Sequence, residues 1–433
     1  MHLEKRGAVS VAAGRDASIN DMKPQQITQT IWSFATLKLP PEPGLMKRLS
    51  ERAVQTMEEF QPSQIARLTW SFASLNLKPD QRLVKAMSDR AVTRPDGFKP
   101  DAIAEIFWSF AVLNIKMEPR LVAALASRAM SALSSYTGKK AAVTLWSVAK
   151  MGLWREFGLV HGLVQRILAN PNALDPPDFG RVMWAISTLG IHAFSATLVD
   201  DLCNLAENKI HEFQAEDLAS LVKGYALVEY HADSKHFSTL WKRTLVVLTN
   251  FQPESLSDYI WGHAMLEVSP EARVSAELIN RSMSIMSLFK PNEISSILWG
   301  FAKLDFTLDP MQMSNISRCA LNKMDTFMPG DVSRLTHAHG LLRLRPDSGL
   351  LDAIRARAVE IVKDFSHEEL TNLLWGFSAL SIEPDPALVS QAAIANRASS
   401  PRDRSPQKGK PEHTAISPQS KSRKSTTIKP AHK

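Results

Sequence analysis

Arginine recurs in the sequence at one fixed spacing, and it is the most regular of the side chains that could carry chemistry. Wherever no position is skipped, neighbouring members stand 38 residues apart, and the column consists of Arg52, Arg90, Arg128, Arg166, Arg243, Arg281 and Arg357. A guanidinium group can hold a phosphate through two parallel hydrogen bonds, so this column could grip a nucleic-acid backbone. The alternative is a structural role, in which each arginine pairs with a neighbouring carboxylate or with free carbonyls at a helix end.

A second column at the same spacing is polar but varies from one member to the next. It consists of Gln29, Arg67, Glu105, Arg181, Ser220, Asp258, Ser296, Arg334 and Asn372, with Val143 as its one apolar member. Such side chains offer the donors and acceptors that discriminate the exposed edges of RNA bases. The column is therefore a candidate for base contact, and the alternative is a set of exposed positions that merely tolerate polar residues.

Motifs of known catalytic or cofactor sites are absent from the sequence. It contains no phosphate-binding glycine loop, no GxSxG elbow and no HExxH pair. Its two cysteines, Cys203 and Cys319, have no Cys/His cluster around them and are expected to be reduced, buried thiols. We interpret His337 and His339 as local repacking within one repeat rather than as a metal or catalytic pair. The sequence thus predicts no enzyme activity, no cofactor, no metal and no small-molecule substrate.

Tryptophan reveals the element that positions both columns, because it marks a repeat of 38 residues with one inserted residue after the fifth unit. The series is Trp32, Trp70, Trp108, Trp146, Trp184, Trp261, Trp299 and Trp375, with Lys223 and His337 in the two vacant slots. The text around each slot is close to Ile/Leu-Trp-Ser/Gly-Phe-Ala-x-Leu. A period of this length indicates a helical solenoid.

Each repeat carries the signals of two helices. An aromatic residue lies ten positions before the tryptophan slot, commonly two residues before a proline such as Pro62 or Pro100, and proline favours the first turn of a helix. Ser366 with Glu369 has the spacing of a capping box, and Asp175 is a suitable N-cap. A second helix follows a Pro- or Asp-containing turn, as expected for residues 43–57, 80–92 and 119–133. The predicted fold is all-α: a solenoid of about ten helix hairpins.

Stacked hairpins must bury their apolar faces against one another, so we expect the tryptophans in the core, where truncation to alanine would cost about 3–5 kcal/mol. The alternative for the tryptophans is a platform on which bases stack. At about 100° per residue, the apolar columns leave one gap on the first helix of each pair. We expect the variable column to lie in this gap beside the small residues that follow the tryptophan slot. Together these two columns would line one continuous groove.

Charge is distributed unevenly along the chain, whose formal net charge is +7. Residues 397–433 hold ten lysines and arginines against two acids, which leaves 41 basic and 42 acidic residues elsewhere. We expect these residues, rich in Ser, Pro, Lys and Arg, to be a disordered tail that either binds phosphate without sequence preference or only aids solubility. Residues 23–396 form the expected solenoid. No apolar run is long enough to predict a membrane span.

The N-terminal segment, residues 1–22, allows two interpretations. Its basic residues among Ala, Val and Ser are typical of a transit peptide, whereas Glu4, Asp16 and Asp21 argue against one. The segment is otherwise a disordered extension or the remnant of a further repeat.

The repeats resemble the octotricopeptide repeat of organellar RNA-binding proteins, and they are similar to the repeats of FAST-kinase-like, RAP-domain and RNA-editing substrate-binding complex proteins. The resemblance rests on the Leu-Trp-x-Phe-Ala-x-Leu block, best seen at residues 298–304 and 373–380, and covers roughly residues 23–396. It implies binding of single-stranded RNA in mitochondria or chloroplasts, in transcript stabilisation, processing, splicing, editing or translation. No C-terminal RAP-like domain is visible.

Two classes of function remain. The resemblance favours a single-stranded RNA-binding protein, for which helical-repeat readers commonly allot about one base per repeat, or about ten nucleotides here. The nearly neutral charge of the repeats favours a protein-binding scaffold of armadillo or HEAT type that docks other ribonucleoprotein subunits.

Overall fold

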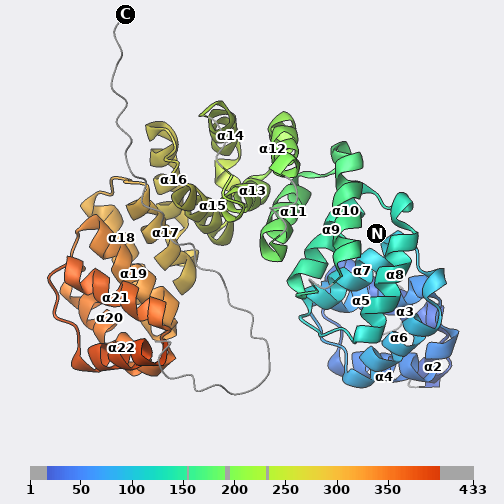
Figure 1. The fold of residues 1–433 in the computed structure, drawn as a ribbon. Helices are drawn as coiled ribbons and strands as arrows, with labels where there is room; N and C mark the ends of the chain where they lie inside the picture. The colour runs from blue at the N-terminus through green and yellow to red at the C-terminus, as the bar shows by residue number, and fades with distance from the viewer. Residues whose placement is uncertain (1–16, 154–155, 191–195, 231–233, 400–433) are drawn as a thin grey trace, which may run out of the picture.

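The chain folds into an arch of stacked helix pairs in the computed structural model, which describes residues 17–153, 156–190, 196–230 and 234–399 (Figure 1). Every regular element of these described residues is helical, and they form ten successive pairs after the short helix α2 (Ala17–Asn20). The predicted all-α solenoid of about ten hairpins is confirmed.

The first helices of the pairs form one layer, which we call the inner layer. Its members are α3 (Pro24–Leu37), α5 (Pro62–Ser74), α7 (Pro100–Val112), α9 (Gly138–Lys150), α11 (Pro176–Leu189), α13 (Ala215–Leu227), α15 (Pro253–Leu266), α17 (Pro291–Lys303), α19 (Pro329–Leu342) and α21 (His367–Ala379). They pack on one another more extensively than the second helices do, as expected on the inside of a curve. In the middle of the arch α11 and α13 lie inside α12 and α14 (Figure 1).

The second helices form the outer layer. Its members are α4 (Pro43–Gln55), α6 (Gln81–Thr93), α8 (Pro119–Ser131), α10 (Phe157–Ala169), α12 (Ala196–Lys209), α14 (Ser234–Val247), α16 (Ala272–Ile285), α18 (Pro310–Leu321), α20 (Ser348–Glu360) and α22 (Pro386–Ser399). Short 3-10 turns such as η1 (Met57–Glu59) and η3 (Leu133–Ser135) follow the outer helices. The helices expected over 43–57 and 119–133 therefore end slightly earlier, and their last residues belong to these turns.

The residues that the sequence indicated as helix starts do lie at the beginnings of the inner helices. Pro62 and Pro100 occupy the first turns of α5 and α7. The Ser366 side chain accepts a hydrogen bond from the Glu369 backbone N–H, as a capping box requires. The aromatic residues upstream are wholly buried at Phe60, Phe98, Tyr136, Phe213, Phe251, Phe289 and Phe327. They fill the space where a 3-10 turn meets the next inner helix.

A left-handed residue ends every inner helix, always six positions after the tryptophan slot. These residues are Lys38, Asn76, Asn114, Gly152, Gly190, Glu229, Glu267, Asp305, Arg343 and Ser381. The next backbone N–H then reaches five residues back, as from Leu39 to the carbonyl of Phe34 at 3.1 Å. This is the Schellman arrangement, which satisfies carbonyls that the helix leaves free. The sequence hides it because only two of the ten positions are glycine, the residue that marks such turns.

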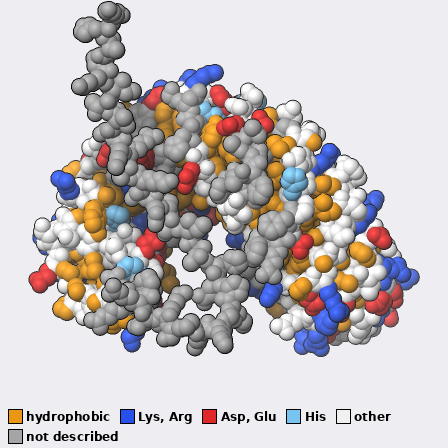
Figure 2. All heavy atoms as spheres, in the orientation of Figure 1, with side chains coloured by type: hydrophobic (Ala, Val, Ile, Leu, Met, Phe, Trp, Pro, Cys, Tyr) orange, Lys and Arg blue, Asp and Glu red, His pale blue; other side chains and the backbone are white. Residues whose placement is uncertain are grey.

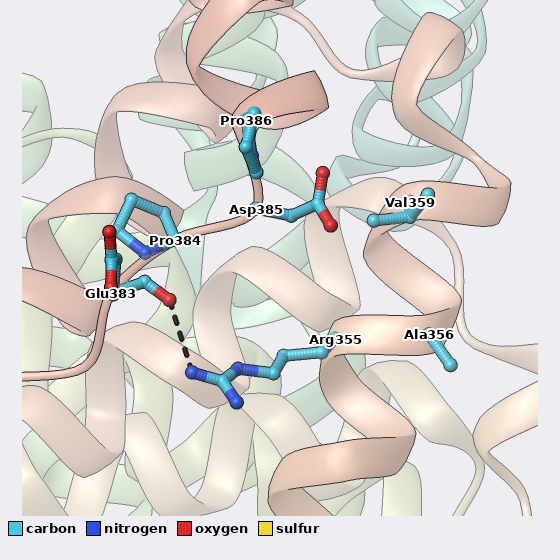
Figure 3. A pocket seen from close by; sticks show the side chains of 7 residues that line it. All are labelled: Arg355, Ala356, Val359, Glu383, Pro384, Asp385 and Pro386. Atoms are coloured by element: carbon cyan, nitrogen blue, oxygen red, sulfur yellow. Dashed lines mark hydrogen bonds between the residues drawn. The ribbon is translucent and has the colours of Figure 1, made fainter.

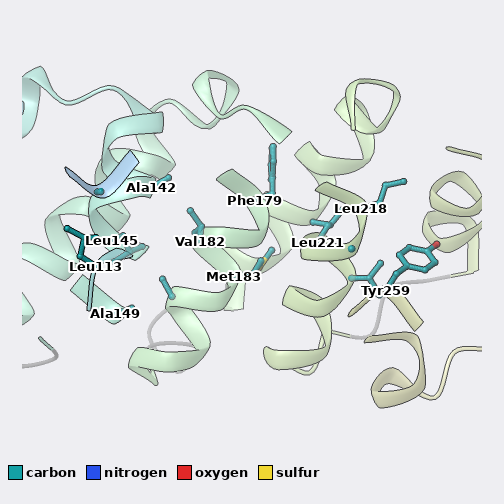
Figure 4. Close-up of a cluster of buried hydrophobic side chains, with 14 of the residues drawn as sticks. Leu113, Ala142, Leu145, Ala149, Phe179, Val182, Met183, Leu218, Leu221 and Tyr259 are labelled. Carbon is teal, nitrogen blue, oxygen red and sulfur yellow. The ribbon is translucent and has the colours of Figure 1, made fainter. Parts of the chain in front are cut away.

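One continuous core runs through the whole arch between the two layers. Figure 4 shows its central part, where Leu145 from α9, Phe179 and Met183 from α11, Leu221 from α13 and Tyr259 from α15 follow one another. Each repeat shares buried side chains with the next, so no pair forms a separate core.

The ends of the solenoid differ slightly from the expected boundaries of 23 and 396. Ile19 and Met22 already belong to the core at the N-terminal end, and α22 continues to Ser399. Most of the segment assigned to residues 1–22 and nearly all of the tail 397–433 lie outside the described residues, namely 1–16 and 400–433.

Candidate nucleic-acid interface on the inner face

The inner helices turn their tryptophan slots away from the outer layer. At about 100° per residue, the positions five before and two after the slot lie nearly opposite it on the helix. Ile103 and Phe110 occupy these positions in α7 and are buried in the core, at 0% and 4% exposure. Trp108 is consequently directed to the inner face of the arch.

The tryptophans lie at the edge of the core and not inside it, so our expectation that they would be core residues is only partly met. Trp108, Trp184 and Trp299 pack against the core while part of each ring stays exposed. Trp32, Trp70, Trp108, Trp146, Trp184, Trp261 and Trp299 are half-buried, and Trp375 is 44% exposed. The residue immediately before the tryptophan is the one buried in the core, as at Phe107 and Leu145, which are 0% exposed. Because Ile/Leu/Phe and Trp are adjacent in the repeat, hydrophobicity alone did not distinguish the buried column from the exposed one.

The small residues after the tryptophan do not line a groove either, although we expected them there. Ser71, Ser109 and Ser147 are at most 1% exposed. A Cβ placed on Gly300 would lie 2.5 Å from Ile260 of the preceding inner helix. These positions are small because consecutive inner helices touch there, which is a packing requirement and not an opening to solvent.

The variable column does lie on the inner face beside the tryptophans. Gln29, Arg67 and Ser220 are exposed, and Glu105, Arg181, Asp258, Ser296, Arg334 and Asn372 are half-buried. Within one helix the column stands three residues before the tryptophan, so both project to the same side. The structure therefore brings together the base-contact candidates and the indole rings, a combination that the sequence did not predict.

Side chains of the variable column contact the slot or the variable column of the neighbouring repeat. The Arg67 guanidinium lies over the Trp32 ring, 5.6 Å from its centroid, and Lys223 pairs with Asp258 at 2.8 Å. The Arg334 guanidinium donates to the hydroxyls of Ser295 and Ser296 at 3.2 and 3.1 Å. The face is thus continuous from repeat to repeat.

Aromatic and cationic groups also adjoin one another along the inner face. The rings of Trp146 and Trp184 are 6.2 Å apart, and the Lys150 ammonium lies 5.8 Å from the Trp184 centroid. His337, in a slot without tryptophan, meets the Trp375 ring edge-on at 4.6 Å. We call the tryptophan slots and the variable column together the inner Trp face. Partly exposed indoles beside hydrogen-bonding side chains are the features with which proteins stack and read unpaired bases.

The arginine column lies elsewhere, and its guanidinium groups are engaged with the protein itself. The Nε–H donates to the carbonyl of the residue two positions before the first residue of the inner helix of the same pair, in Arg52 to Met22, Arg90 to Phe60, Arg128 to Phe98, Arg166 to Tyr136, Arg243 to Phe213, Arg281 to Phe251 and Arg357 to Phe327. Because that carbonyl follows the 3-10 turn of the preceding outer helix, each arginine fastens two consecutive outer helices.

Carboxylates hold other nitrogens of some of these groups, as in the contacts of Arg90 with Glu58 at 3.2 Å and of Arg357 with Glu360 at 2.7 Å. These contacts correspond to the structural role expected as the alternative to phosphate binding, in which each arginine pairs with a carboxylate or with free carbonyls. They favour the structural role of this column, and phosphate contact stays the alternative hypothesis.

Lysine makes the same connection in two repeats without this arginine. Lys209 Nζ donates to the Leu174 carbonyl at 2.9 Å, and Lys323 Nζ donates to the Phe289 carbonyl. Both carbonyls belong to the position that the arginines bind elsewhere. In these two repeats the arginine position holds Asn204 and Cys319, and the lysines stand five and four residues later. The alignment of the repeats therefore did not reveal them.

Two cavities lie on the inner face. The larger, of about 270 Å³, has Trp70, Trp108 and Glu105 in its wall, and the other, of about 190 Å³, lies between Gln29 and Arg67. Burial raises the pKa of the Glu105 carboxyl, and nearby Lys140 partly offsets this effect. Both cavities include members of the variable column.

A third cavity lies at the C-terminal end, where Arg355 of α20 faces the loop before α22 (Figure 3). Arg355 donates to the Glu383 carbonyl at 3.1 Å, and Pro384 and Pro386 flank that loop. Arg355 is the one basic residue in the wall of this cavity, and its guanidinium already donates a hydrogen bond to the backbone.

Charges are mixed over the surface. On the face visible in Figure 2, Lys and Arg are interspersed with Asp and Glu, as the nearly neutral composition of the repeats requires. Within the described ranges, no group of His, Cys, Asp and Glu could hold a metal ion, and no helix is long and apolar enough to cross a membrane. Cys203 and Cys319 are buried and form no disulfide.

Comparison with known proteins gives one family. The model of the RNA-editing substrate-binding complex 6 protein family matches residues 9–156 and 152–400, which is most of the chain. No curated protein matches. Among solved structures, a homology model of the full-length AP-3 complex in an intermediate open conformation is similar at 10% identity. The match covers 88% of this chain and 79% of that chain, with a TM-score of 0.28. Nothing about function follows from a likeness at that level.

Proposed function

Because the chain belongs to the RNA-editing substrate-binding complex 6 protein family, we propose that it binds single-stranded RNA along the inner Trp face and serves RNA processing. The family name connects the chain with RNA editing and with a substrate-binding complex, so other subunits of a ribonucleoprotein are expected partners. Membership of the octotricopeptide group and location in mitochondria are parts of the same proposal. The family match lends no support to a chloroplast location.

The observation that carries the proposal is the row of half-buried indoles on the inner helices. A large aromatic ring that a protein leaves partly exposed loses part of the free energy of burial. Repetition of this feature in eight of the ten repeats indicates selection for contact with a ligand. Every base has a π-face, and stacking of a base on an aromatic side chain contributes about 1–3 kcal/mol. Duplex RNA keeps its bases paired and stacked, so the proposal is specific for single strands.

We further propose that the protein has no catalytic activity of its own. The variable column and the indoles would bind and orient the RNA, and the sequence carries no motif of a known catalytic site. Chemistry on the bound RNA would then belong to partner subunits.

The experiment that tests the proposal measures the affinity of the full-length chain for one RNA sequence as a single strand and as a duplex, at two salt concentrations. Binding through the basic residues 400–433 alone depends steeply on salt and favours the more highly charged duplex. Binding on the inner Trp face favours the single strand, and this preference grows as salt rises. Equal or better binding of the duplex at both salt concentrations would refute the proposal.

Protein binding is a second candidate function, and the neutral charge of the repeats is the observation that favours it. Repeats with nearly balanced charge can accept an extended peptide or another helical subunit. The two candidates separate in the same experiment, since a scaffold retains no single-strand preference at high salt.

A further inference from the structure

The larger inner cavity combines two indole rings with a carboxylate, and no other described cavity does. It lies across α5, α7, α9 and α11 and has a volume of about 270 Å³. Trp70, Trp108 and Glu105 belong to its wall, with Lys139, Lys140 and Arg181 around them. The volume equals that of about nine water molecules in the liquid, which is enough for a purine base.

The charges around the cavity leave Glu105 in a different state from the neighbouring acids. Lys140 pairs with Asp101 at 3.2 Å, Lys139 pairs with Asp175, and Arg181 pairs with Asp178 at 2.9 Å. Each cation is thus matched with an aspartate outside the centre of the cavity. These pairs neutralise the rim, so a phosphate backbone passing over it meets little net repulsion.

Glu105 therefore has the character of a ligand-binding carboxylate. It is half-buried on α7, and desolvation is the largest cause of its raised pKa. The other carboxylate of the variable column, Asp258, is held by both oxygens to the Lys223 ammonium at 2.8 and 2.9 Å. The same position thus carries Asp258, paired with a lysine, in one repeat and Glu105, which shares a cavity with two indole rings, in another.

The hydrogen-bonding pattern of the four bases decides which one suits an ionised carboxylate between aromatic rings. A carboxylate only accepts hydrogen bonds, through two parallel oxygens. Guanine is the one base with two adjacent donors on its Watson–Crick edge, N1–H and N2–H. Adenine and cytosine place a ring acceptor beside their amino group, and uracil places its single N–H between two carbonyls.

We infer that this cavity is a guanine-binding site, in which Glu105 accepts hydrogen bonds from N1–H and N2–H while the base stacks on Trp70 or Trp108. The inference rests on the proposed function, because it gives one repeat of the inner Trp face a base preference. Purines also expose more ring area to an indole than pyrimidines do, which favours the same base. The remaining repeats supply affinity with other preferences.

The test uses the full-length chain and oligouridylates of about ten nucleotides, one per repeat. One carries a single central guanosine, others carry inosine or adenosine there, and one carries uridine throughout. We expect about tenfold tighter binding of the guanosine oligomer than of the adenosine oligomer. Inosine, which lacks the N2 amino group, is expected between them.

Two variants assign the preference to the carboxylate. Glu105→Gln replaces one acceptor by a donor, so the guanosine-to-adenosine affinity ratio falls to about one. Glu51→Gln is the matched control, because it makes the same substitution at an exposed position of the outer helix α4, and it leaves the ratio unchanged. Circular dichroism confirms that both variants are folded.

The possible outcomes distinguish failure of the guanine site from failure of the proposed single-stranded RNA binding. A wild-type chain that binds all four oligomers equally well overturns the guanine site and leaves single-stranded RNA binding intact. The same holds if Glu105→Gln keeps the full ratio. A chain that binds none of the oligomers overturns both.

Discussion

At the scale of single residues, two adjacent aromatic side chains of one helix have opposite roles. Phe107 is wholly buried between the layers, whereas Trp108 is half-buried on the inner face. The free energy that each contributes to folding follows the area removed from water. Their sequence neighbourhood is the same, so only the three-dimensional packing separates a core residue from a surface residue here.

Truncation of these two residues should reveal the difference directly. Phe107→Ala is expected to lower the free energy of unfolding by about 3–5 kcal/mol, the range for a buried aromatic. Trp108→Ala should lower it by less, because part of the ring already meets solvent. Urea unfolding followed by circular dichroism measures both. Equal losses would mean that the indole is a core residue after all.

Histidine in a core position makes stability depend on pH. His263 of α15 occupies the column that holds phenylalanine in several other repeats, and it is wholly buried. Its Nε2 accepts from Trp241 Nε1–H at 3.0 Å, so Nδ1 carries the proton and donates to the Tyr259 carbonyl at 3.0 Å. Burial lowers the pKa of His263 to about 4.

The sign of the effect follows from this lowered pKa. In the unfolded chain the imidazole takes up a proton near pH 6.5, and in the folded chain only near pH 4. The stabilisation is therefore complete above pH 6.5 and is lost as pH falls toward 4. Between pH 7.5 and pH 5 the wild type should lose about 2 kcal/mol more than His263→Phe, as urea unfolding at the two pH values would show. Parallel pH profiles would contradict the assignment.

At the scale of elements, the arginines act as fasteners between neighbouring outer helices. Both Nε and Nη2 of Arg281 donate to the Phe251 carbonyl, at 3.2 and 2.8 Å. The loop that carries this carbonyl lies between the 3-10 turn η7 (Leu248–Asn250) and the inner helix α15. One side chain thereby fixes how an outer helix joins the preceding turn.

Removal of one fastener should affect stability and not RNA binding. Arg281→Ala is expected to lower the free energy of unfolding by about 1.5–3 kcal/mol, the value of a charged hydrogen bond. Arg281→Lys should recover part of this loss, since lysines serve the same carbonyl position in two other repeats. RNA affinity, measured in parallel, should stay unchanged. Weaker binding of every RNA with a flatter salt dependence would instead identify a phosphate contact.

The sequence predicts the elements well and the surface poorly, and the reason is physical. Proline, capping residues and the buried aromatic before each inner helix act locally, so they disclose the helix starts. Which column faces solvent depends on contacts between repeats. The small residues after tryptophan illustrate this, because a site of close helix contact and a site open to solvent both accept serine and glycine. The tryptophan slots and the variable column could be assigned to the same face only after that packing was known.

At the scale of the whole molecule, the stacked pairs convert a repeated local pattern into one long surface. Each repeat contributes one slot to the inner face, nine of the ten also contribute a polar side chain, and the shared core holds them in register. Such a surface suits a ligand that is itself a repeating chain. The central claim is that single-stranded RNA lies along this face and stacks on its indoles.

The affinity of the full-length chain for an unstructured RNA of about ten nucleotides tests this claim most directly. The test variant is Trp146→Ala/Trp184→Ala, which removes two neighbouring rings of the inner Trp face. The control is Met130→Ala/Met311→Ala, which removes two exposed side chains from the outer helices α8 and α18. With both variants folded, we predict at least about tenfold weaker binding for the tryptophan pair and unchanged binding for the methionine pair. Wild-type affinity in the tryptophan variant would contradict the account.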